Sequence, residues 1–256
     1  MAGLPRRLGH AEEATLGEHL EELRGRLFVM LGAIGVGTIV AYVFHQRVLH
    51  WLNQPLPPGH RHLLATGVAE PFTVTITVSL YAGFVLALPI VLWQIWLFFA
   101  PAFDPSAERK VLALALASLA LAAAGVAFGY WILLPRAVHF LTNYDKTNFI
   151  HLIRASSYYN FVVTVLVGVV IVFQTPLVVV GLVSLGVLSS RTLRKHRRIG
   201  YFVTATIALA LPGPDPVTTL LELLPMWILF ESSIWLAALV ERRRAKVEPA
   251  SATLGG

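Results

Sequence analysis

Residues 19–44 read HLEELRGRLFVMLGAIGVGTIVAYVF, and they join a charged segment directly to a long apolar run. The first nine residues carry two glutamates and two arginines, whereas the stretch from Leu27 to Phe44 carries no charged residue. A membrane-spanning helix needs about 20 apolar residues, so this stretch predicts a span that starts immediately after the charged segment. A plain membrane anchor needs positive charge at this point but no carboxylates. The glutamates therefore indicate a site that binds a cation at the membrane surface.

The composition of the whole chain is that of an integral membrane protein. Of its 256 residues, 56% are hydrophobic and 13% are charged, whereas about 25% are charged in a typical soluble domain. The apolar residues form continuous runs, which favours helices over the alternating segments of a β-barrel. We therefore predict an all-α integral membrane protein with a single membrane domain over residues 1–256. Cysteine is absent, which excludes disulfides and thiolate chemistry.

Six apolar runs predict six transmembrane helices. They are Leu27–Phe44, Phe72–Phe103, Val111–Leu134, Tyr158–Val187, Ile199–Leu211 and Val217–Val240. We expect them to form a concave bundle over residues 27–240. The fifth run would cover only about 20 Å as a helix, which is short of a hydrocarbon core of about 30 Å. Local thinning of the bilayer or a shielding partner would have to compensate.

Basic residues are divided unequally between the two sides that six crossings create. On the side of the termini lie fifteen: Arg6, Arg7, Arg24, Arg26, Arg109, Lys110, Arg191, Arg194, Lys195, Arg197, Arg198, Arg242, Arg243, Arg244 and Lys246. On the other side lie five: Arg47, Arg61, Arg136, Lys146 and Arg154. By the positive-inside rule, both termini are cytoplasmic and the chain is a multi-pass protein of the cell membrane. The net charge is thus explained by topology, without nucleic acid as a partner.

The segments outside the predicted spans have distinct characters. Residues 1–26 form a cytoplasmic amphipathic segment without an apolar run, so we expect no cleavable signal peptide. Residues 241–256 form a cytoplasmic tail, which we expect to be disordered from Glu248 onward. The outer connection His45–Pro71 is long and rich in proline, and we expect an ordered cap there rather than a tight turn.

The amphipathic segment itself has a helical pattern. Thr15 and Glu18 fit a capping box at its start. At 100° per residue, the leucines at positions 16, 20, 23 and 27 fall on one stripe, which should rest on the membrane or on the other spans. Glu22 lies to one side of this stripe, four residues before Arg26, and Arg24 lies on the opposite flank. The structural alternative to a binding site is one Glu–Arg pair on the surface of the helix, which would stabilise the helix by roughly 0.2–0.5 kcal/mol.

Further short motifs follow HLEELRGRL in order. They are Asn53-Gln54-Pro55-Leu56, Ala69-Glu70-Pro71-Phe72, Gln94–Pro101 (QIWLFFAP), Glu108-Arg109-Lys110, Phe173-Gln174-Thr175-Pro176, Leu211-Pro212-Gly213-Pro214-Asp215 and Phe230-Glu231. Taken together with the topology, they resemble the TatC family, the multispanning subunit of the twin-arginine protein translocase. The chain departs from the family pattern at Gln174, where a glutamate is frequent, and at Arg109-Lys110, where Arg-Arg is frequent.

The resemblance implies a substrate with two consecutive arginines, namely the signal peptide of a folded protein. Planar guanidinium groups pair bidentately with carboxylates, so acids on the cytoplasmic side are needed as acceptors. We expect Glu22 and Glu108 to be these acceptors, with Arg24 orienting one of them or supporting the loop. Phe98 would shape the turn before Glu108. The structural alternatives are that Glu108 pairs with its basic neighbours and that Phe98 is an interfacial anchor.

The resemblance also implies partner subunits of the single-span TatA and TatB types, self-association in a larger complex, and export driven by the proton gradient. It places Gln174 at a contact with these subunits, and Pro176 should kink the fourth span beside it. The alternative for Gln174 is a hydrogen bond within the chain. Pro55, Glu70 and Asp215 belong to the outer turns, and we expect Asp215 to serve the backbone of its turn.

No catalytic residue, metal site or cofactor is expected. The sequence contains no Walker motif and no nucleophile elbow, and the histidines at 60 and 62 lack a metalloprotease spacing. Two alternatives from other classes stay open at this point. One is a small-solute transporter with polar residues at a midplane site, and the other is an intramembrane enzyme. Absence of a visible internal repeat weighs against the first, and absence of a paired nucleophile and base weighs against the second.

Overall fold

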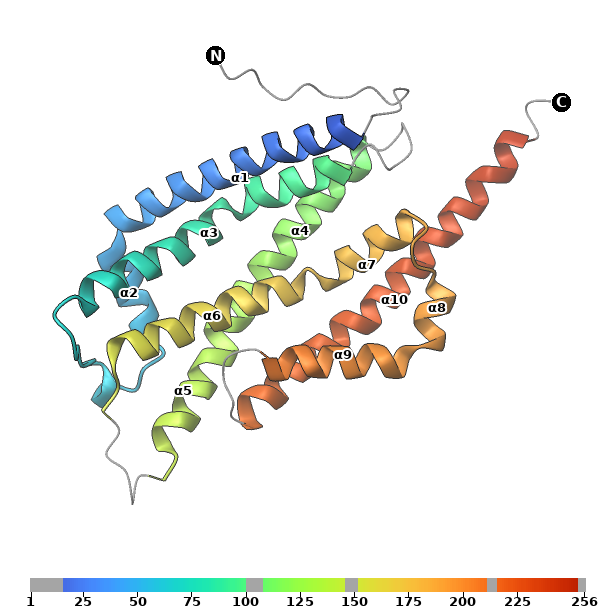
Figure 1. Cartoon of the computed structure of the whole chain (residues 1–256). Coiled ribbons are helices and arrows are strands. Elements are labelled where there is room, and N and C mark those ends of the chain that lie inside the picture. Colours follow the sequence, from blue (N-terminus) through green and yellow to red (C-terminus); the bar gives the residue numbers. More distant parts are fainter. Residues whose placement is uncertain (1–15, 100–107, 146–151, 211–215, 253–256) are drawn as a thin grey trace, which may run out of the picture.

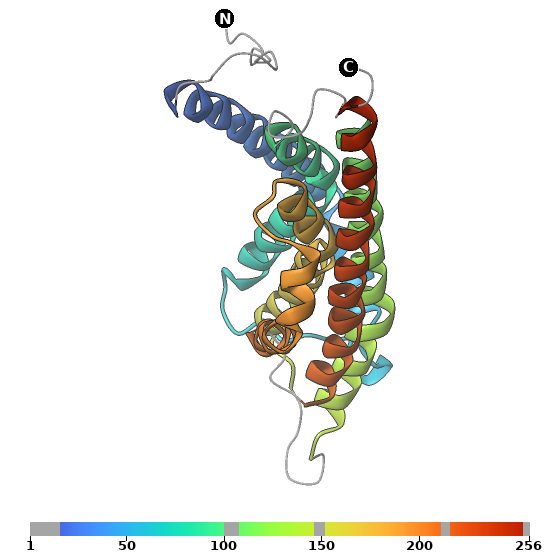
Figure 2. The same cartoon turned by 90° about the vertical axis from the view of Figure 1, so that its right-hand side faces the viewer.

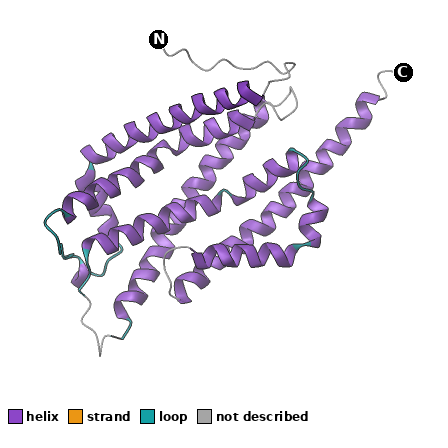
Figure 3. Ribbon diagram, in the orientation of Figure 1, coloured by secondary structure: helices purple, strands orange, loops and turns teal. Residues whose placement is uncertain are grey.

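The computed structural model describes residues 16–99, 108–145, 152–210 and 216–252 (Figure 1). Within these ranges the regular elements are helical (Figure 3), and one isolated bridge joins Leu64 to Arg154. The longer helices are α1 (Leu16–Val43), α3 (Glu70–Phe99), α4 (Glu108–Phe128), α6 (Ala155–Phe173) and α10 (Pro216–Ala252). The shorter ones are α2 (His45–Asn53), α5 (Leu134–Asn143), α7 (Thr175–Ser184), α8 (Ser190–Lys195) and α9 (Arg197–Ala210).

Each of the six predicted apolar runs is helical over most of the residues that the structure describes. Five stretches in the described part of the chain are long and apolar enough to cross a membrane: Leu20–Val43, Glu70–Phe99, Leu112–Asn143, Ala155–Ser184 and Thr218–Arg242. The fifth run forms α9, which has 14 residues and covers about 21 Å. The protein is thus an all-helical membrane protein with five candidate spans, and the sixth crossing stays a prediction.

The charged segment and the first span are one helix. α1 runs from Leu16 to Val43 without interruption, so from Leu16 onward the predicted cytoplasmic segment is not a separate element. Thr15, the predicted N-cap, lies outside the described residues. Leu20, Leu23 and Leu27 are 64%, 40% and 49% exposed. These three leucines therefore do not pack on the other described helices, and a membrane surface beneath them stays a prediction.

Two other predicted runs contain a break or a distortion. The fourth is divided at Gln174 into α6 and α7, because Pro176 has no N–H with which to continue the helical ladder. The Thr175 hydroxyl donates to the freed Val172 carbonyl at 2.6 Å, so this acceptor keeps a hydrogen bond at the break. The third continues from α4 through a π-helical turn, Gly129–Leu133, into α5 and ends at Asn143. α3, in contrast, continues through Pro89 as one helix.

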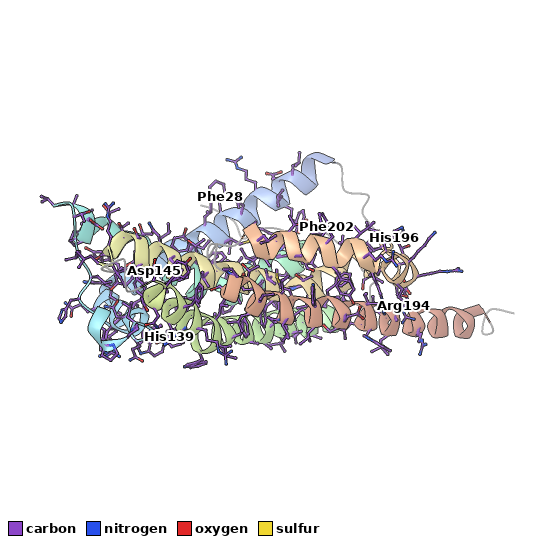
Figure 4. All side chains as sticks on the ribbon, turned by 90° about the horizontal axis from the view of Figure 1, so that it is seen from below. Phe28, His139, Asp145, Arg194, His196 and Phe202 are labelled. Carbon is purple, nitrogen blue, oxygen red and sulfur yellow. The ribbon has the colours of Figure 1, made fainter. Side chains whose placement is uncertain are left out.

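Both ends of the bundle can be identified by their helix termini. The start of α1, the end of α3, the start of α4 and the end of α10 lie at one end (Figures 1 and 2). α9 reverses the chain direction between α7 and α10. Seen from below, Arg194 and His196 near α8 lie at the end opposite His139 and Asp145 (Figure 4). The described helices therefore alternate in direction as six crossings would.

The segment between α1 and α3 is ordered, as predicted. It contains α2 and a short 3₁₀ turn, Pro58–His60, and Leu56 within it is 1% exposed. Leu56 belongs to the largest apolar core, together with Val78, Leu133 and Val162. The segment between α1 and α3 is therefore packed on α3, α5 and α6 rather than projecting from them.

The predicted disorder of the C-terminal segment is wrong for residues 248–252. α10 continues to Ala252 as helix. The residues that follow Val240 are mostly Glu, Arg, Lys and Ala, which are strong helix formers. Extending an existing helix avoids the cost of nucleation, so charge alone does not end it.

Candidate functional site

Glu22 and Arg26 form a buried ion pair near the start of α1. Arg26 Nε donates to Glu22 Oε1 at 3.0 Å, and Arg26 Nη2 donates to the same oxygen. Glu22 is 9% exposed and Arg26 is 8% exposed, whereas Glu21 is exposed to solvent. Glu22 and Arg26, which lie four residues apart on one helix, therefore do form an ion pair. The pair is buried, however, and not on the surface.

Gln94 of α3 completes this cluster. Arg26 Nη1 donates to Gln94 Oε1 at 3.2 Å, so one guanidinium joins α1 to the last turns of α3. Burial of a charge without a partner is costly, and this arrangement supplies both charge compensation and hydrogen bonds. The cluster shows that a carboxylate and an amide oxygen here can hold a guanidinium away from water.

Three other predicted site residues, Arg24, Phe98 and Glu108, lie at the same end of the bundle as this cluster. The Arg24 guanidinium lies 5.7 Å from the centre of the Phe28 ring, so the structure joins Arg26, not Arg24, to Glu22. The half-buried Phe98 packs edge-on against Phe99 at the end of α3, with ring centroids 5.4 Å apart. Glu108 is the first residue of α4, at the same end of the bundle as the start of α1 (Figure 1). The side chain of Glu108 lies outside the described part of the structure.

Gln174 lies at the helix break and bonds within the chain. Its Nε2 donates to the backbone carbonyl of Ser118 in α4 at 3.2 Å. The Ser118 hydroxyl in turn accepts a hydrogen bond from the indole N–H of Trp96 in α3. Pro176 is buried in the first turn of α7. The break in the fourth predicted span is thus tied to α4, and through it to α3.

Glu70 connects three segments at the opposite end of the bundle. Its Oε2 accepts hydrogen bonds from the Thr66 N–H at 2.7 Å, the Thr66 hydroxyl at 2.8 Å and the Gly67 N–H at 3.2 Å. Its Oε1 accepts from Arg154 Nε and the Ser156 N–H, both at 3.0 Å. Glu70 therefore fastens the segment between α1 and α3 to the starts of α3 and α6. The five donors explain why a carboxylate is needed there.

Tyrosine hydroxyls hold the end of α2 in the same region, just before the turn at Pro55. The bonds are Tyr130 Oη to Trp51 O at 2.8 Å, Tyr158 Oη to Leu52 O at 2.6 Å and Tyr159 Oη to Asn53 Oδ1 at 2.9 Å. The sequence motifs pointed to Pro55 and Glu70 but not to these tyrosines. Asp215, the other predicted residue of the outer turns, lies outside the described residues.

The remaining polar residues of the apolar runs are separate from the first cluster. Glu231 of α10 accepts a hydrogen bond from the Tyr201 hydroxyl and lies 3.4 Å from the Arg197 guanidinium, both on α9. Glu222 of α10 is 3% exposed and lines a small cavity with Phe128 and Met226. The structure thus places the polar residues in separate locations: Gln94 against α1, Gln174 against α4 and Glu231 against α9.

Comparison with known proteins gives the same assignment along nearly the whole chain. The sequence profile of the family "Sec-independent protein translocase protein (TatC)" matches residues 18–225. The TatCd protein of Bacillus subtilis is 34% identical over 242 residues, which cover 94% of this chain and 98% of that one. The chloroplastic TATC protein of Arabidopsis thaliana is 30% identical over 232 residues, covering 90% of this chain and 68% of that one.

Solved structures agree with the sequence relatives. A crystal structure described as the twin arginine translocase receptor TatC superposes with a TM-score of 0.75 at 31% identity, and it covers 86% of this chain and 98% of that one. A second, in the detergent DDM, gives a TM-score of 0.77 at 30% identity.

The chain belongs to the TatC family of Sec-independent protein translocase proteins. It is a multi-pass membrane subunit of the twin-arginine translocase and not an enzyme. The family assignment therefore decides against the small-solute transporter and the intramembrane enzyme.

Proposed function

We propose that this chain receives twin-arginine signal peptides at Glu22, which acts as a guanidinium acceptor. The observation that carries the proposal is that Glu22 already holds the guanidinium of Arg26 in a buried site. A signal-peptide arginine offers the same planar fork of N–H donors. Exclusion of water strengthens such a charge-assisted bond relative to one at the surface.

Glu108 is the second proposed acceptor. Its place at the start of α4 supports this role, because the helix begins at the same end of the bundle as α1 (Figure 1). Two acceptors on different helices would suit two consecutive arginines, whose side chains diverge. Phe98, at the end of α3, would support the turn between them, and Arg24 would support the surface beside Phe28.

Glu22→Gln and Glu108→Gln test these assignments against Glu21→Gln as the matched control. Each full-length variant, reconstituted in lipid nanodiscs, would be photo-crosslinked to a twin-arginine peptide and to its twin-lysine form. We expect both acceptor variants to lose most crosslinking, and the control to retain it, because Glu21 is exposed. A twin-lysine peptide should crosslink weakly to the wild type, since an ammonium lacks the planar fork. Undiminished crosslinking of Glu22→Gln would refute the assignment of that residue.

We propose further that the chain crosses the membrane six times, with both termini in the cytoplasm. The unequal division of basic residues supports this orientation, and the direction of α9 between α7 and α10 supports the sixth crossing. The chain has no cysteine, so single cysteines can be introduced without a background. Thiol labelling at position 17 from the cytoplasm and at position 59 from the opposite side is the expected pattern.

Partner subunits of the TatA and TatB types are proposed to bind near the break at Gln174 and Pro176. The family assignment supports such partners in general, and the bend between α6 and α7 supports a concave face beside it. Six helices of this size cannot enclose a folded cargo protein. We therefore propose that export needs several chains, with the proton gradient as its energy source.

A further inference from the structure

The guanidinium site on α1 and α3 is already occupied in the peptide-free chain. Glu22 and Gln94 bond to opposite sides of the Arg26 guanidinium: Nε and Nη2 donate to Glu22 Oε1, and Nη1 donates to Gln94 Oε1 at 3.2 Å. Three nitrogens of one guanidinium are therefore bonded by two side chains from different helices. A site of this form is selective for guanidinium, because an ammonium has no planar array of donors to reach both acceptors.

We infer that Arg26 is an internal placeholder, and that a signal-peptide arginine binds by replacing it between Glu22 and Gln94. This inference rests on the proposed function, since it describes which cation fills the Glu22 site before the peptide binds and how the peptide replaces that cation. A buried carboxylate without a cation carries a large desolvation penalty. A receptor that must persist without its peptide needs an internal cation, and Arg26 supplies one of the same chemistry as the ligand.

The geometry permits the exchange. Arg26 lies one turn from Glu22 on the same helix, beside exposed residues such as Leu27 and Phe28. Its long side chain can leave the carboxylate and direct its guanidinium to the polar surface of the membrane while its methylenes stay on apolar surface. Glu22 and Gln94 belong to helices that pack along much of their length, so both acceptors stay in place during the exchange.

The exchange predicts that loss of the Arg26–Glu22 contact raises the affinity for the peptide. If Arg26 competes with the peptide, Arg26→Gln should bind a twin-arginine peptide more tightly than the wild type, by roughly tenfold, since the competing charge-assisted bonds are worth about that factor. Association should also become faster, because no internal pair has to open. In the Arg26→Gln background, an added Gln94→Leu should weaken binding by about threefold to tenfold, since the peptide guanidinium then loses one acceptor that no internal guanidinium uses in the free chain.

The experiment is a titration of the full-length chain in nanodiscs with a fluorescent twin-arginine peptide. The variants are Arg26→Gln, the double variant Arg26→Gln with Gln94→Leu, Glu22→Gln and the control Glu21→Gln. Tighter binding by Arg26→Gln, loss of part of that gain when Gln94→Leu is added, and loss of binding by Glu22→Gln support the exchange. Unchanged or weaker binding by Arg26→Gln, together with loss by Glu22→Gln, overturns the exchange and leaves the proposed function intact. Full binding by Glu22→Gln overturns both at this site.

A second measurement on the wild type covers the case in which Arg26→Gln does not fold. The Arg26 Nε–H is hydrogen-bonded and buried, so its side-chain NMR signal should exchange slowly with water. The signal is assigned by its loss in Arg26→Lys. Saturating twin-arginine peptide should bring this N–H into fast exchange, and the twin-lysine peptide should leave it unchanged. A slowly exchanging Arg26 signal in the saturated complex overturns the exchange.

Discussion

Gly37 of α1 lies directly against Gly83 of α3, and the two helices meet there through their backbones. A Cβ atom on Gly37 would stand 2.5 Å from the Gly83 carbonyl oxygen. Small residues allow membrane helices to pack through van der Waals contact where no hydrophobic effect drives them together. This contact fixes the distance between the helix that carries Glu22 and the helix that carries Gln94.

Gly83→Ala should therefore destabilise the protein. The added methyl would meet the backbone and side chain of Thr38, and such overpacking typically costs about 1–3 kcal/mol. The free energy of unfolding, measured by SDS titration in mixed micelles with far-UV circular dichroism, gives the value. Gly35→Ala is the matched control, because nothing lies within 4 Å of its added Cβ. Equal stability of Gly83→Ala and the wild type would contradict the close contact.

Glu70→Gln should make the segment between α1 and α3 less ordered. A glutamine keeps the shape but turns one acceptor oxygen into an N–H₂ group that faces existing donors, so we expect a loss of about 1–3 kcal/mol in the free energy of unfolding. Protease cleavage between residues 57 and 69 should become faster at the same time. Thr73→Val serves as the control, since the Thr73 hydroxyl bonds within its own helix to the Ala69 carbonyl. Unaltered cleavage in Glu70→Gln would show that the hydrogen bonds to Glu70 are not needed to keep this segment ordered.

The tyrosines that hold α2 predict a graded series of Tyr→Phe variants. Tyr158→Phe removes a buried bond and leaves the Leu52 carbonyl without that donor, so it should cost about 1–3 kcal/mol. Tyr159→Phe should cost less, because its bond to Asn53 is only partly buried. Tyr130→Phe should cost least, since its bond to the Trp51 carbonyl is exposed and water can replace it. Unfolding free energies in any other order would contradict this assignment of burial.

Local patterns in the sequence predict the helices and one of the key contacts. An apolar run specifies a helix because lipid forces the backbone to bond within its own segment. Each of the six predicted runs is helical over most of its described residues. The Glu22–Arg26 contact follows from a spacing of four residues on one helix. The sequence also predicts that the fifth helix is short, and α9 has only 14 residues.

Contacts between distant residues could not be read in the same way. Gln94 is 68 residues from Arg26, and Gln174 is 56 residues from Ser118. These pairings depend on how the helices rotate and pack, which hydrophobic periodicity does not specify in a helix that is apolar on all sides. For the same reason, the sequence indicates the Glu22–Arg26 pair but not Gln94, which the packing of α3 brings to the Arg26 guanidinium.

Gln174 offers a test that separates a role within the chain from a role toward partners. Its Nε2 donates to the Ser118 carbonyl, while among the described residues no donor bonds to its Oε1. We propose that this oxygen is the end available to a partner helix. Gln174→Leu should then lower the unfolding free energy of the isolated chain by about 0.6–1.7 kcal/mol, the range of such bonds in membranes, and also reduce co-purification of a TatB-type subunit.

Gln174→Glu distinguishes the two effects, because an ionised carboxylate accepts hydrogen bonds but does not donate them. It should lose the bond to Ser118, and with it a similar amount of stability, while it keeps the acceptor for the partner. We therefore expect co-purification of the partner to be normal in Gln174→Glu and reduced in Gln174→Leu, with both variants less stable than the wild type. Normal co-purification in both variants would limit Gln174 to its bond with Ser118. Reduced co-purification in both would mean that the partner depends on the donor, and hence on the tie between the helix break and α4.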